Sequence, residues 1–512
     1  MLVHINGAKC IGIDAAGVTV EVDITLGIGV HLCGLPDVAV KESLLRTVTA
    51  LQSIGYRIPG KKIVINLAPA DMHKNGSGYD LPIALGIIAA SGQETLPDVE
   101  SFLVMGELGL DGSLRGIPGG LPMAQYARDS GFKACVLPYS SALEASMLEG
   151  VRVYGARTLQ DAVRIIRGDG DIDDLCVSGA PAAAPKRVAP EVDFADIVGQ
   201  EAAKRAMEIA AAGGHNIILV GSPGSGKSSL AKAMNGILPP LSKEEALVTS
   251  KIYSVVGRGN LSEGLMTSRP FRSPHYSASL PAVIGGGGSD GIYPGEVSLA
   301  HGGVLFLDEF GQMPRSVVEA LRGPLEDRKV IISRLKTKVE YPASFILVAA
   351  SNPCPCGYYG DGDRCTCTPS RRMAYFSRLS GPIMDRIDLQ VFVRAVPTEQ
   401  IVRRSEVKSE SSAVVAKRVL EARHRQQERF AGEEIACNAA MTNRHIERYC
   451  PLSEVCKNML ENLMDRMHLS MRAYCRIIKV ARTIADLEGV EEITPAHLCE
   501  AASYRSLDKI TV

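Results

Sequence analysis

Apolar residues change their spacing several times near the start of the chain, and each change predicts a new element of secondary structure. Apolar and polar residues alternate over residues 17–30, as in a half-buried strand, and apolar residues recur at helical spacing over 38–54. Residues 61–67 again fit a strand, and residues 80–90 fit a helix. The beginning of the chain is therefore expected to combine strands and helices.

The same alternation continues as far as residue 168. The pair Asp111-Gly112 predicts a hairpin turn within residues 103–114. Further strands are expected at 134–137 and 151–154, each followed by a helix, and the last of these helices ends near Arg167. We predict one α+β domain over residues 1–168.

The rest of the chain divides where its composition changes. Residues 169–191 contain Asp-Gly repeats and a run of Ala and Pro, which cannot bury enough surface to fold and is expected to be a linker. Residues 192–396 carry the short apolar runs of a parallel sheet, and residues 397–512 are expected to form a helical lid. The predicted fold class is α/β, and the length of 512 residues agrees with roughly three domains.

A glycine-rich segment carries the first chemical signature. After the apolar run 216–220 come Gly221, Ser222, Pro223, Gly224, Ser225, Gly226, Lys227 and Ser228. Two glycines four residues apart, followed by Lys and Ser, form the P-loop pattern, in which backbone N–H groups and a helix N-terminus surround phosphate oxygens. Lys227 is expected to reach the β- and γ-phosphates of ATP, and the Ser228 hydroxyl to bind Mg²⁺. The alternative is a Gly-rich turn before an ordinary helix.

Two later strand-like segments end in polar residues. The apolar run 304–307 leads to Asp308 and Glu309, at the end of a strand where α/β sheets bind ligands. We expect Asp308 to hold Mg²⁺ through water and Glu309 to act as general base. The run 345–350 leads to Asn352, whose side chain is expected to orient the same water. Acids that merely cap a strand are the alternative.

Two arginines follow at positions typical of nucleotide motors. Arg386 is expected to act on the γ-phosphate of a neighbouring subunit, and the alternative is a structural Asp–Arg pair. Ser470 is the predicted N-cap of a helix over 471–487, which places Arg472 and Arg476 on one face. We assign an ATP contact to Arg472 and a structural role to Arg476.

Bulk composition excludes several classes of protein. Hydrophobic residues make up 46% and charged residues 22% of the chain, as in soluble globular proteins. The most apolar stretch, 81–90, is too short to cross a bilayer, and the N-terminus shows no secretory signal, so no membrane partner is expected. Thirteen cysteines, an odd number, favour reduced thiols and a cytoplasmic location.

A net charge of −1 means that any affinity for nucleic acid requires a local basic element. Residues 328–339 provide one, because two strand-like arms flank a basic turn. Arg334, Lys336 and Lys338 are therefore predicted to bind single-stranded or branched DNA, with several copies lining the pore of a ring. The alternative is an edge hairpin whose lysines prevent aggregation. The Gly-rich segment 281–295 is expected to be a second, flexible pore loop.

Four cysteines lie in one loop, as Cys354-Pro355-Cys356 and Cys365-Thr366-Cys367. Four thiolates match a structural tetrahedral zinc, although C-x-C spacing is less usual than C-x₂-C. Chance clustering and redox sensing are the alternatives.

Several segments resemble the Mg-chelatase-like AAA+ family called YifB or ComM, and the resemblance extends from the first residues to the last helix. It implies a hexameric AAA+ motor with a Lon-like N-terminal domain and a helical lid, which takes part in DNA branch migration during natural transformation. Tyr276 departs from the family, where a second His is expected. The segments are 269–275, 294–301, 352–357 and 481–487.

The comparison with Lon also predicts what the N-terminal domain lacks. Where Lon has its nucleophilic Ser, this chain has Gly78, and where Lon has its base lysine, it has Ala124. Ser77 is a conceivable shifted nucleophile, but no lysine is placed to activate it. We expect a scaffold without protease activity.

Three classes of function compete on this sequence. The leading hypothesis is an ATP-driven hexameric motor on DNA. A Mg-chelatase-type motor subunit that remodels a protein partner is the second, and residues 1–168 argue against it. An ATP-dependent protease is the third, and Gly78 and Ala124 argue against that.

Overall fold

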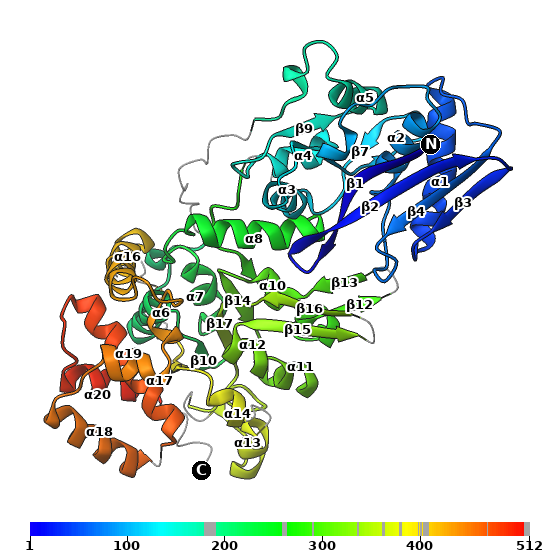
Figure 1. The fold of residues 1–512 in the computed structure, drawn as a ribbon. Helices are drawn as coiled ribbons and strands as arrows, with labels where there is room; N and C mark the ends of the chain where they lie inside the picture. Colours follow the sequence, from blue (N-terminus) through cyan, green and yellow to red (C-terminus); the bar gives the residue numbers. More distant parts are fainter. Residues whose placement is uncertain are drawn as a thin grey trace.

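The computed structural model is a mixed α/β structure whose described residues form two large sheets, three two-stranded hairpins and a helical C-terminal region (Figure 1). Lys336 and most of the predicted linker fall outside the described residues, and only the backbone of residues 334, 337 and 376 is described. The structure describes all residues except 179–190, 259–263, 289–290, 335–336, 361–363, 378–380, 398, 400–401, 403–408, 468 and 506–512.

The N-terminal part contains a seven-stranded mixed sheet in the order β3-β4-β2-β1-β5-β8-β9. The first strand, β1, pairs antiparallel with β2 over the whole length of β1, and β4 runs antiparallel to β2. The strands are β1 (Leu2–Ile11), β2 (Asp14–Thr25), β3 (Gly29–Cys33), β4 (Lys62–Ala68), β5 (Phe102–Val104), β8 (Ala134–Pro138) and β9 (Val153–Ala156).

The prediction of one strand over residues 17–30 is wrong. Gly27 and Gly29 have φ angles of 132° and 105°, which interrupt the extended backbone. The chain therefore leaves β2 at Thr25 and re-enters the sheet as β3, parallel to β4.

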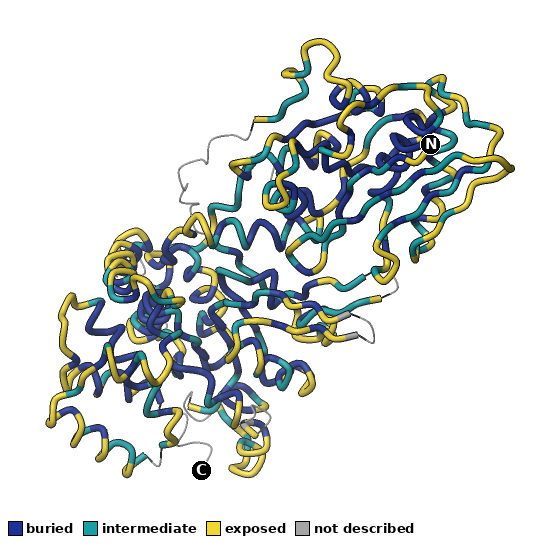
Figure 2. Tube along the Cα trace, in the orientation of Figure 1, coloured by how far each residue is buried: buried dark blue, intermediate teal, exposed yellow. Residues whose placement is uncertain are grey.

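Helices confirm the predicted pattern and pack around this sheet. The helix expected over 80–90 is α2, and every one of its residues is buried (Figure 2). Its first residue, Asp80, accepts hydrogen bonds from Arg46 Nε at 3.0 Å and Leu108 N at 3.1 Å, which joins α1, α2 and the hairpin β6–β7. The elements are α1 (Val38–Ser53), α2 (Asp80–Ala90), β6 (Glu107–Leu108), β7 (Leu114–Arg115), α3 (Gly120–Asp129), α4 (Tyr139–Ala145) and α5 (Leu159–Arg167).

The second sheet has five parallel strands in the order β11-β14-β17-β10-β18. Its central strands are buried, which explains why they appear in the sequence as continuous apolar runs. The strands are β10 (Ile217–Gly221), β11 (Phe271–Arg272), β14 (Val304–Leu307), β17 (Ile346–Ser351) and β18 (Leu389–Val393), and the helices are α6 (Glu201–Gly213), α7 (Lys227–Met234), α8 (Lys243–Val256), α9 (Leu280–Ile284), α10 (Glu296–Leu299), α11 (Arg315–Ala320), α12 (Arg322–Asp327), α13 (Pro369–Phe376) and α14 (Gly381–Met384).

Two hairpins project from this sheet and lie side by side (Figure 1). The basic segment forms β15 (Lys329–Arg334) and β16 (Thr337–Pro342), as predicted. The Gly-rich segment, expected to be flexible, forms β12 (Gly285–Gly288) and β13 (Gly291–Pro294), because glycine backbone can pair in a ladder as any other residue does. Tyr341 donates a hydrogen bond to Ile292 O at 2.8 Å and joins the two hairpins.

The C-terminal region is helical and packs on α6 through its longest helices. Ser470 caps α19, as predicted, with its side chain accepting a hydrogen bond from Ala473 N at 3.2 Å. The helices are α16 (Ser412–Arg429), α17 (Asn443–Tyr449), α18 (Glu454–Met467), α19 (Met471–Glu488) and α20 (Pro495–Ser503).

Helix α8 joins the second sheet to the N-terminal part by packing against α3 (Figure 1). Near its C-terminus, Ser254 O accepts a hydrogen bond from Gly119 N at 3.0 Å, and Ser254 Oγ donates to Glu144 Oε1 at 2.9 Å. The buried ammonium of Lys251 pairs with Asp14 at the start of β2. These contacts hold the two parts against each other in addition to the chain segment that connects them.

Candidate nucleotide-binding site

The turn between β10 and α7 has the backbone that the P-loop pattern predicts. Gly224 and Gly226 have φ angles of 77° and 91°, a region that side chains other than glycine rarely adopt. A Cβ atom at either position would meet nothing within 4 Å, so conformation and not crowding selects glycine there. At Gly221 the reason is different, since a Cβ atom would overlap the carbonyl oxygen of Val393.

A cavity of about 420 Å³ lies between this turn and the carboxyl ends of β14 and β17. The structure thus brings together the P-loop, the two acids and Asn352, which come from three separate segments of the chain. Its lining consists of Pro223, Gly224, Ser225, Gly226, Lys227, Ser228, Ser229, Asp308, Glu309, Ser351 and Asn352.

The two side chains assigned to Mg²⁺ touch each other. Ser228 Oγ donates a hydrogen bond to Asp308 Oδ2 at 2.9 Å, and Glu309 N donates to Asp308 Oδ1 at 2.9 Å. A hydroxyl and a carboxylate are the oxygen ligands that Mg²⁺ accepts beside nucleotide phosphates. Ser225 Oγ, in the same turn, is buried without a hydrogen-bond partner among the described residues. The residues present are therefore suitable for binding a nucleotide together with Mg²⁺.

The Lys227 ammonium lies inside the turn. Its Nζ donates to Gly221 O at 2.8 Å and to Ser222 O at 2.9 Å. Burial lowers the pKa of Lys227, and the carboxylate of Asp308 opposes that shift. The cation is thus held by carbonyl oxygens at the mouth of the cavity, from which it can turn toward phosphate.

Glu309 has a strained backbone. Its φ and ψ angles of 50° and 39° are left-handed, which costs a residue other than glycine about 1–3 kcal/mol. The strain turns the chain sharply after β14 and leaves the carboxylate at the cavity. A sterically unfavourable residue retained at this point supports a functional role for it.

Gln200 contacts the P-loop turn from outside the cavity lining, and the sequence analysis missed it. It has a φ angle of 61°, and its Nε2 donates to Ser225 O at 3.2 Å and to Arg394 O at 2.6 Å. The side chain therefore ties the phosphate turn to the segment after β18. The only signal in the sequence is a Gly-Gln pair directly before a helix.

Arg386 does not reach this cavity in its own chain. The side chain is buried, with Nε donating to Glu326 Oε2 at 3.1 Å and NH1 to Pro382 O at 2.7 Å. Asp388, two residues later, accepts from Asn216 N at 3.0 Å, which places this segment at the amino end of β10. The P-loop follows the carboxyl end of that strand, roughly 16 Å away for five residues of extended chain.

Arg472 is exposed and lies close to Glu326, the partner of Arg386. Hydrogen bonding from Arg386, with the charges of Arg472 and Arg476 nearby, lowers the pKa of Glu326. Arg476 forms an ion pair with Asp388, as its structural assignment predicts. Both arginines assigned to ATP thus lie at the amino ends of the strands, whereas the nucleotide cavity of the same chain lies at their carboxyl ends.

The basic hairpin is described only in part. Lys338 is exposed on β16, and Arg334 ends β15 with only its backbone described. At the base, Lys329 pairs with Glu340 at 3.1 Å. The DNA contacts of Arg334, Lys336 and Lys338 stay predictions.

The four cysteines of the predicted metal site form one cluster. Their sulfur atoms all lie within 4.8 Å of one another. The Cys354 sulfur is 3.3 Å from that of Cys356 and 3.8 Å from that of Cys365, and Cys356 and Cys365 are 3.7 Å apart. A tetrahedral zinc with bonds of about 2.3 Å requires sulfur atoms about 3.8 Å apart, so the cluster fits zinc.

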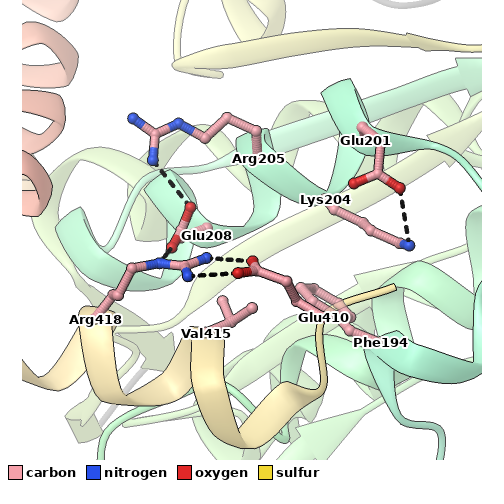
Figure 3. Close-up of a pocket in the computed structure, with 8 residues that line it drawn as sticks. All are labelled: Phe194, Glu201, Lys204, Arg205, Glu208, Glu410, Val415 and Arg418. Atoms are coloured by element: carbon pink, nitrogen blue, oxygen red, sulfur yellow. Dashed lines mark hydrogen bonds and ion pairs between the residues drawn. The ribbon is translucent and has the colours of Figure 1, made fainter. Parts of the chain in front are cut away.

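A second cavity, of about 290 Å³, lies between α6 and α16 (Figure 3). Its charged side chains are paired with one another. Arg418 bridges Glu208, at 2.5 Å, and Glu410, at 2.7 Å, while Arg205 donates to Glu208 at 3.0 Å. The ion pairs in this cavity join α6 to α16.

The N-terminal part holds no Ser–Lys couple at the positions compared with Lon. Ser77 donates to Glu107, and Lys74 Nζ donates to the carbonyl of Pro69. A Cβ atom at Gly78 would lie 2.9 Å from Met105 Cε, so a side chain there would be crowded, and Ala124 is fully buried.

No helix within the described part of the chain is both long enough and apolar enough to cross a membrane.

Comparisons with known proteins cover the whole chain. Three family models match: "Subunit ChlI of Mg-chelatase" over residues 20–141, "Magnesium chelatase, subunit ChlI" over 193–401, and its C-terminal model over 409–505. The Mg-chelatase ChlI family belongs to the AAA+ class, whose members use ATP and Mg²⁺.

Individual relatives agree with the family models. The "Uncharacterized protein YifB" of Escherichia coli is 43% identical over 512 residues, which is all of this chain and 98% of the relative. The "Competence protein ComM" of Haemophilus influenzae is 41% identical over 98% of this chain and 96% of its own length. The "Magnesium-chelatase 38 kDa subunit" of Rhodobacter capsulatus is 25% identical over 34% of this chain and 53% of its own length. The chain therefore belongs to the YifB/ComM family of Mg-chelatase-like AAA+ proteins.

Proposed function

We propose that this protein is an ATP-hydrolysing ring motor that acts on DNA. The observation that carries the proposal is the single cavity that gathers Lys227, Ser228, Asp308, Glu309 and Asn352. In this arrangement Lys227 and the turn hold phosphate, Ser228 and Asp308 hold Mg²⁺, and Glu309 accepts a proton from the attacking water. Magnesium, when bound, supplies positive charge next to the phosphates.

The position of the two arginines supports the proposal of a ring. Arg386 and Arg472 lie at the amino ends of the strands, remote from their own cavity, where a neighbouring copy could use them. A closed ring presents this edge of each subunit to the cavity of the next one. We propose a homo-hexamer, in agreement with the family resemblance.

DNA is the proposed substrate because of the hairpin β15–β16. In a ring, copies of its basic tip would surround a central strand and contact phosphates. A relative that is 41% identical is named a competence protein, which supports DNA handling during natural transformation. We propose helicase activity in branch migration, in the cytoplasm, with a Lon-like N-terminal domain that serves as a non-proteolytic scaffold.

A Mg-chelatase-type motor that remodels a protein partner is the second candidate. All three matching family models carry the Mg-chelatase name, including the one that covers residues 20–141. Such a motor would use the same nucleotide cavity, so only its substrate separates it from the first proposal.

Zinc is the proposed ion of the four-cysteine cluster, with a structural role. All four ligand positions are filled by protein sulfur, which leaves no position open for a reacting molecule.

The test is ATP hydrolysis by the full chain with no DNA, with single-stranded DNA and with branched DNA. Lys227→Ala should abolish hydrolysis, and Arg334→Ala/Lys336→Ala should remove only the stimulation by DNA. Arg57→Ala/Lys61→Ala, which removes two exposed charges from the N-terminal part, is the matched control and should respond to DNA normally. Hydrolysis that ignores every DNA would contradict the DNA proposal and favour a protein substrate.

A further inference from the structure

The four-cysteine cluster begins immediately beside the nucleotide cavity. Cys354 is buried and follows Asn352 by two residues. Gly357 has a φ angle of 87°, and a Cβ atom there would lie only 2.9 Å from Pro223 Cδ. The loop of the cluster therefore packs directly on the turn that holds phosphate, with no room for a side chain between them.

The outer part of the same loop is fastened to the core by aromatic contacts. A Cβ atom at Gly360 would lie 3.1 Å from the ring of Phe392 on β18. The Arg364 guanidinium lies 4.1 Å from the centre of the Tyr358 ring, and that of Arg372 lies 4.2 Å from the Tyr359 ring. Cation–π contacts of this kind add about 0.5–1 kcal/mol each at exposed sites, too little to hold a glycine-containing loop by themselves.

After the last cysteine the chain returns to the cavity. Helix α13 begins two residues after Cys367, and its buried Tyr375 has its hydroxyl 3.5 Å from Ser351 Oγ. A Cβ atom at Gly311, two residues after Glu309, would lie 2.9 Å from the same hydroxyl. One end of the loop thus leaves from Asn352, and the other end supports Ser351 and the turn that carries Glu309.

We propose that a Zn²⁺ ion held by Cys354, Cys356, Cys365 and Cys367 positions Asn352, Glu309 and the Pro223 turn for ATP hydrolysis. The inference rests on the ATPase function proposed above and gives the structural zinc proposed there a positioning role, without a part in the reaction itself. Zinc replaces the thiol protons, which pass to solvent, and closes the loop between its two ends.

The first test is the metal content of the full chain, purified without chelators and measured by mass spectrometry. One zinc per chain is expected, and Cys365→Ser and Cys367→Ser should each lose it. Cys499→Ser, an exposed cysteine on α20, is the matched control and should keep it. A wild-type chain that neither contains zinc nor takes it up from added zinc salt would overturn the proposal, and a disulfide between these cysteines would do the same.

The second test separates positioning from metal binding by leaving all four cysteines in place. Gly357→Ala should keep its zinc but lower kcat at least tenfold, because displacements of about 1 Å in a catalytic site cost up to 10²-fold. Gly432→Ala is the control for backbone strain, since Gly432 has a similar φ angle of 85° but a Cβ atom there meets nothing within 4 Å. Equal kcat values for the two variants, with zinc bound in both, would overturn the positioning role.

Two further measurements keep this inference separate from the proposed function. Tyr375→Phe should retain zinc and the KM for ATP while kcat falls, because the hydroxyl supports Ser351 and not the nucleotide. Affinity for a fluorescent ATP analogue needs no hydrolysis, and Gly357→Ala should weaken it several-fold relative to Gly432→Ala. A wild-type chain that binds zinc and nucleotide but hydrolyses nothing would contradict the proposed function, whereas identical nucleotide affinity in the two glycine variants would contradict this inference.

Discussion

Ser228 Oγ donates a hydrogen bond of 2.9 Å to Asp308 Oδ2, although the two residues are 80 positions apart in the chain. The contact joins the first turn of α7 to the end of β14. It exists because parallel strands deliver their carboxyl ends to one edge of the sheet, where β10 and β14 both finish. A hydroxyl and a carboxylate brought together in this way offer two oxygen ligands for Mg²⁺.

Removing either member of this pair should weaken the magnesium dependence of hydrolysis. We expect Ser228→Ala to raise the Mg²⁺ concentration for half-maximal activity by at least about 10–100-fold, the cost typical of losing even an outer-shell partner of a bound metal. Asp308→Asn should do the same, and the double variant should lose less than the sum, because both act on one ion. Titration of MgCl₂ at saturating ATP measures the effect.

The neighbouring Ser229 provides the matched control. It lines the same cavity and is equally exposed, but it forms no hydrogen bond with Asp308 in the structure. Ser229→Ala should therefore titrate as the wild type does. If Ser229→Ala and Ser228→Ala behave alike, the magnesium assignment is wrong.

Glu309→Gln should separate nucleotide binding from hydrolysis. The amide keeps the shape of the side chain but cannot accept a proton, so kcat is expected to fall by about 10²–10⁴-fold. Affinity for a fluorescent ATP analogue should stay within about twofold, because the P-loop and Asp308 are unchanged. A variant that binds ATP weakly and turns it over normally would refute the general-base role.

The ion pair of Arg386 and Glu326 allows its two possible roles to be distinguished. If Arg386 serves only to hold its own chain together, Arg386→Ala and Glu326→Gln should lower both stability and ATPase activity in parallel. If it serves a neighbouring cavity, Arg386→Ala should abolish hydrolysis while Glu326→Gln leaves it nearly intact. The side chain of Glu326 is 54% exposed, so we expect Glu326→Gln to lower the free energy of unfolding only slightly.

Mixing two inactive variants tests whether Arg386 acts on the cavity of a neighbouring subunit in the ring. Arg386→Ala and Lys227→Ala chains are each expected to be inactive alone. When they are mixed, some interfaces combine an intact cavity with an intact arginine, and hydrolysis should return. Failure of every mixture, with ring formation confirmed by size, would contradict a role between subunits.

The sequence could predict the nucleotide site because its signals are local. A Gly-rich turn between an apolar strand and a helix specifies its own backbone, as the φ angles of Gly224 and Gly226 confirm. Asp308, Glu309 and Asn352 were placed at the cavity by one general rule, that ligands bind at the carboxyl ends of parallel strands. The basic hairpin was predictable for the same kind of reason, since alternation on both sides of a turn needs no distant partner.

The residues that escaped prediction depend on partners far away in the chain. Nothing near Arg386 indicates that Glu326, on α12, will pair with it, and nothing near Ser254 indicates Glu144 in the N-terminal part. Composition was misleading for Gly285–Gly288, because flexible residues become ordered when a ladder of hydrogen bonds and a neighbouring hairpin hold them. In each case tertiary contact, and not local preference, determines the structure.

His301 should make the stability of the protein depend on pH. Its Nδ1 accepts a hydrogen bond from Ser344 N at 3.1 Å, which requires a neutral ring. Burial lowers its pKa to about 4, with Glu245 opposing and Arg269 reinforcing the shift. Between this value and the ordinary pKa of about 6.5, the unfolded chain binds a proton that the folded chain does not, so stability falls as pH falls. From pH 7 to pH 5 the expected loss is about 2 kcal/mol of the free energy of unfolding.

His301→Asn keeps an acceptor for Ser344 N but does not titrate, so its urea midpoint should depend less on pH over this range. His31→Asn, at an exposed histidine of the edge strand β3, should reproduce the pH dependence of the wild type. Equal pH dependence in all three proteins would show that the ring of His301 is not held neutral by the fold.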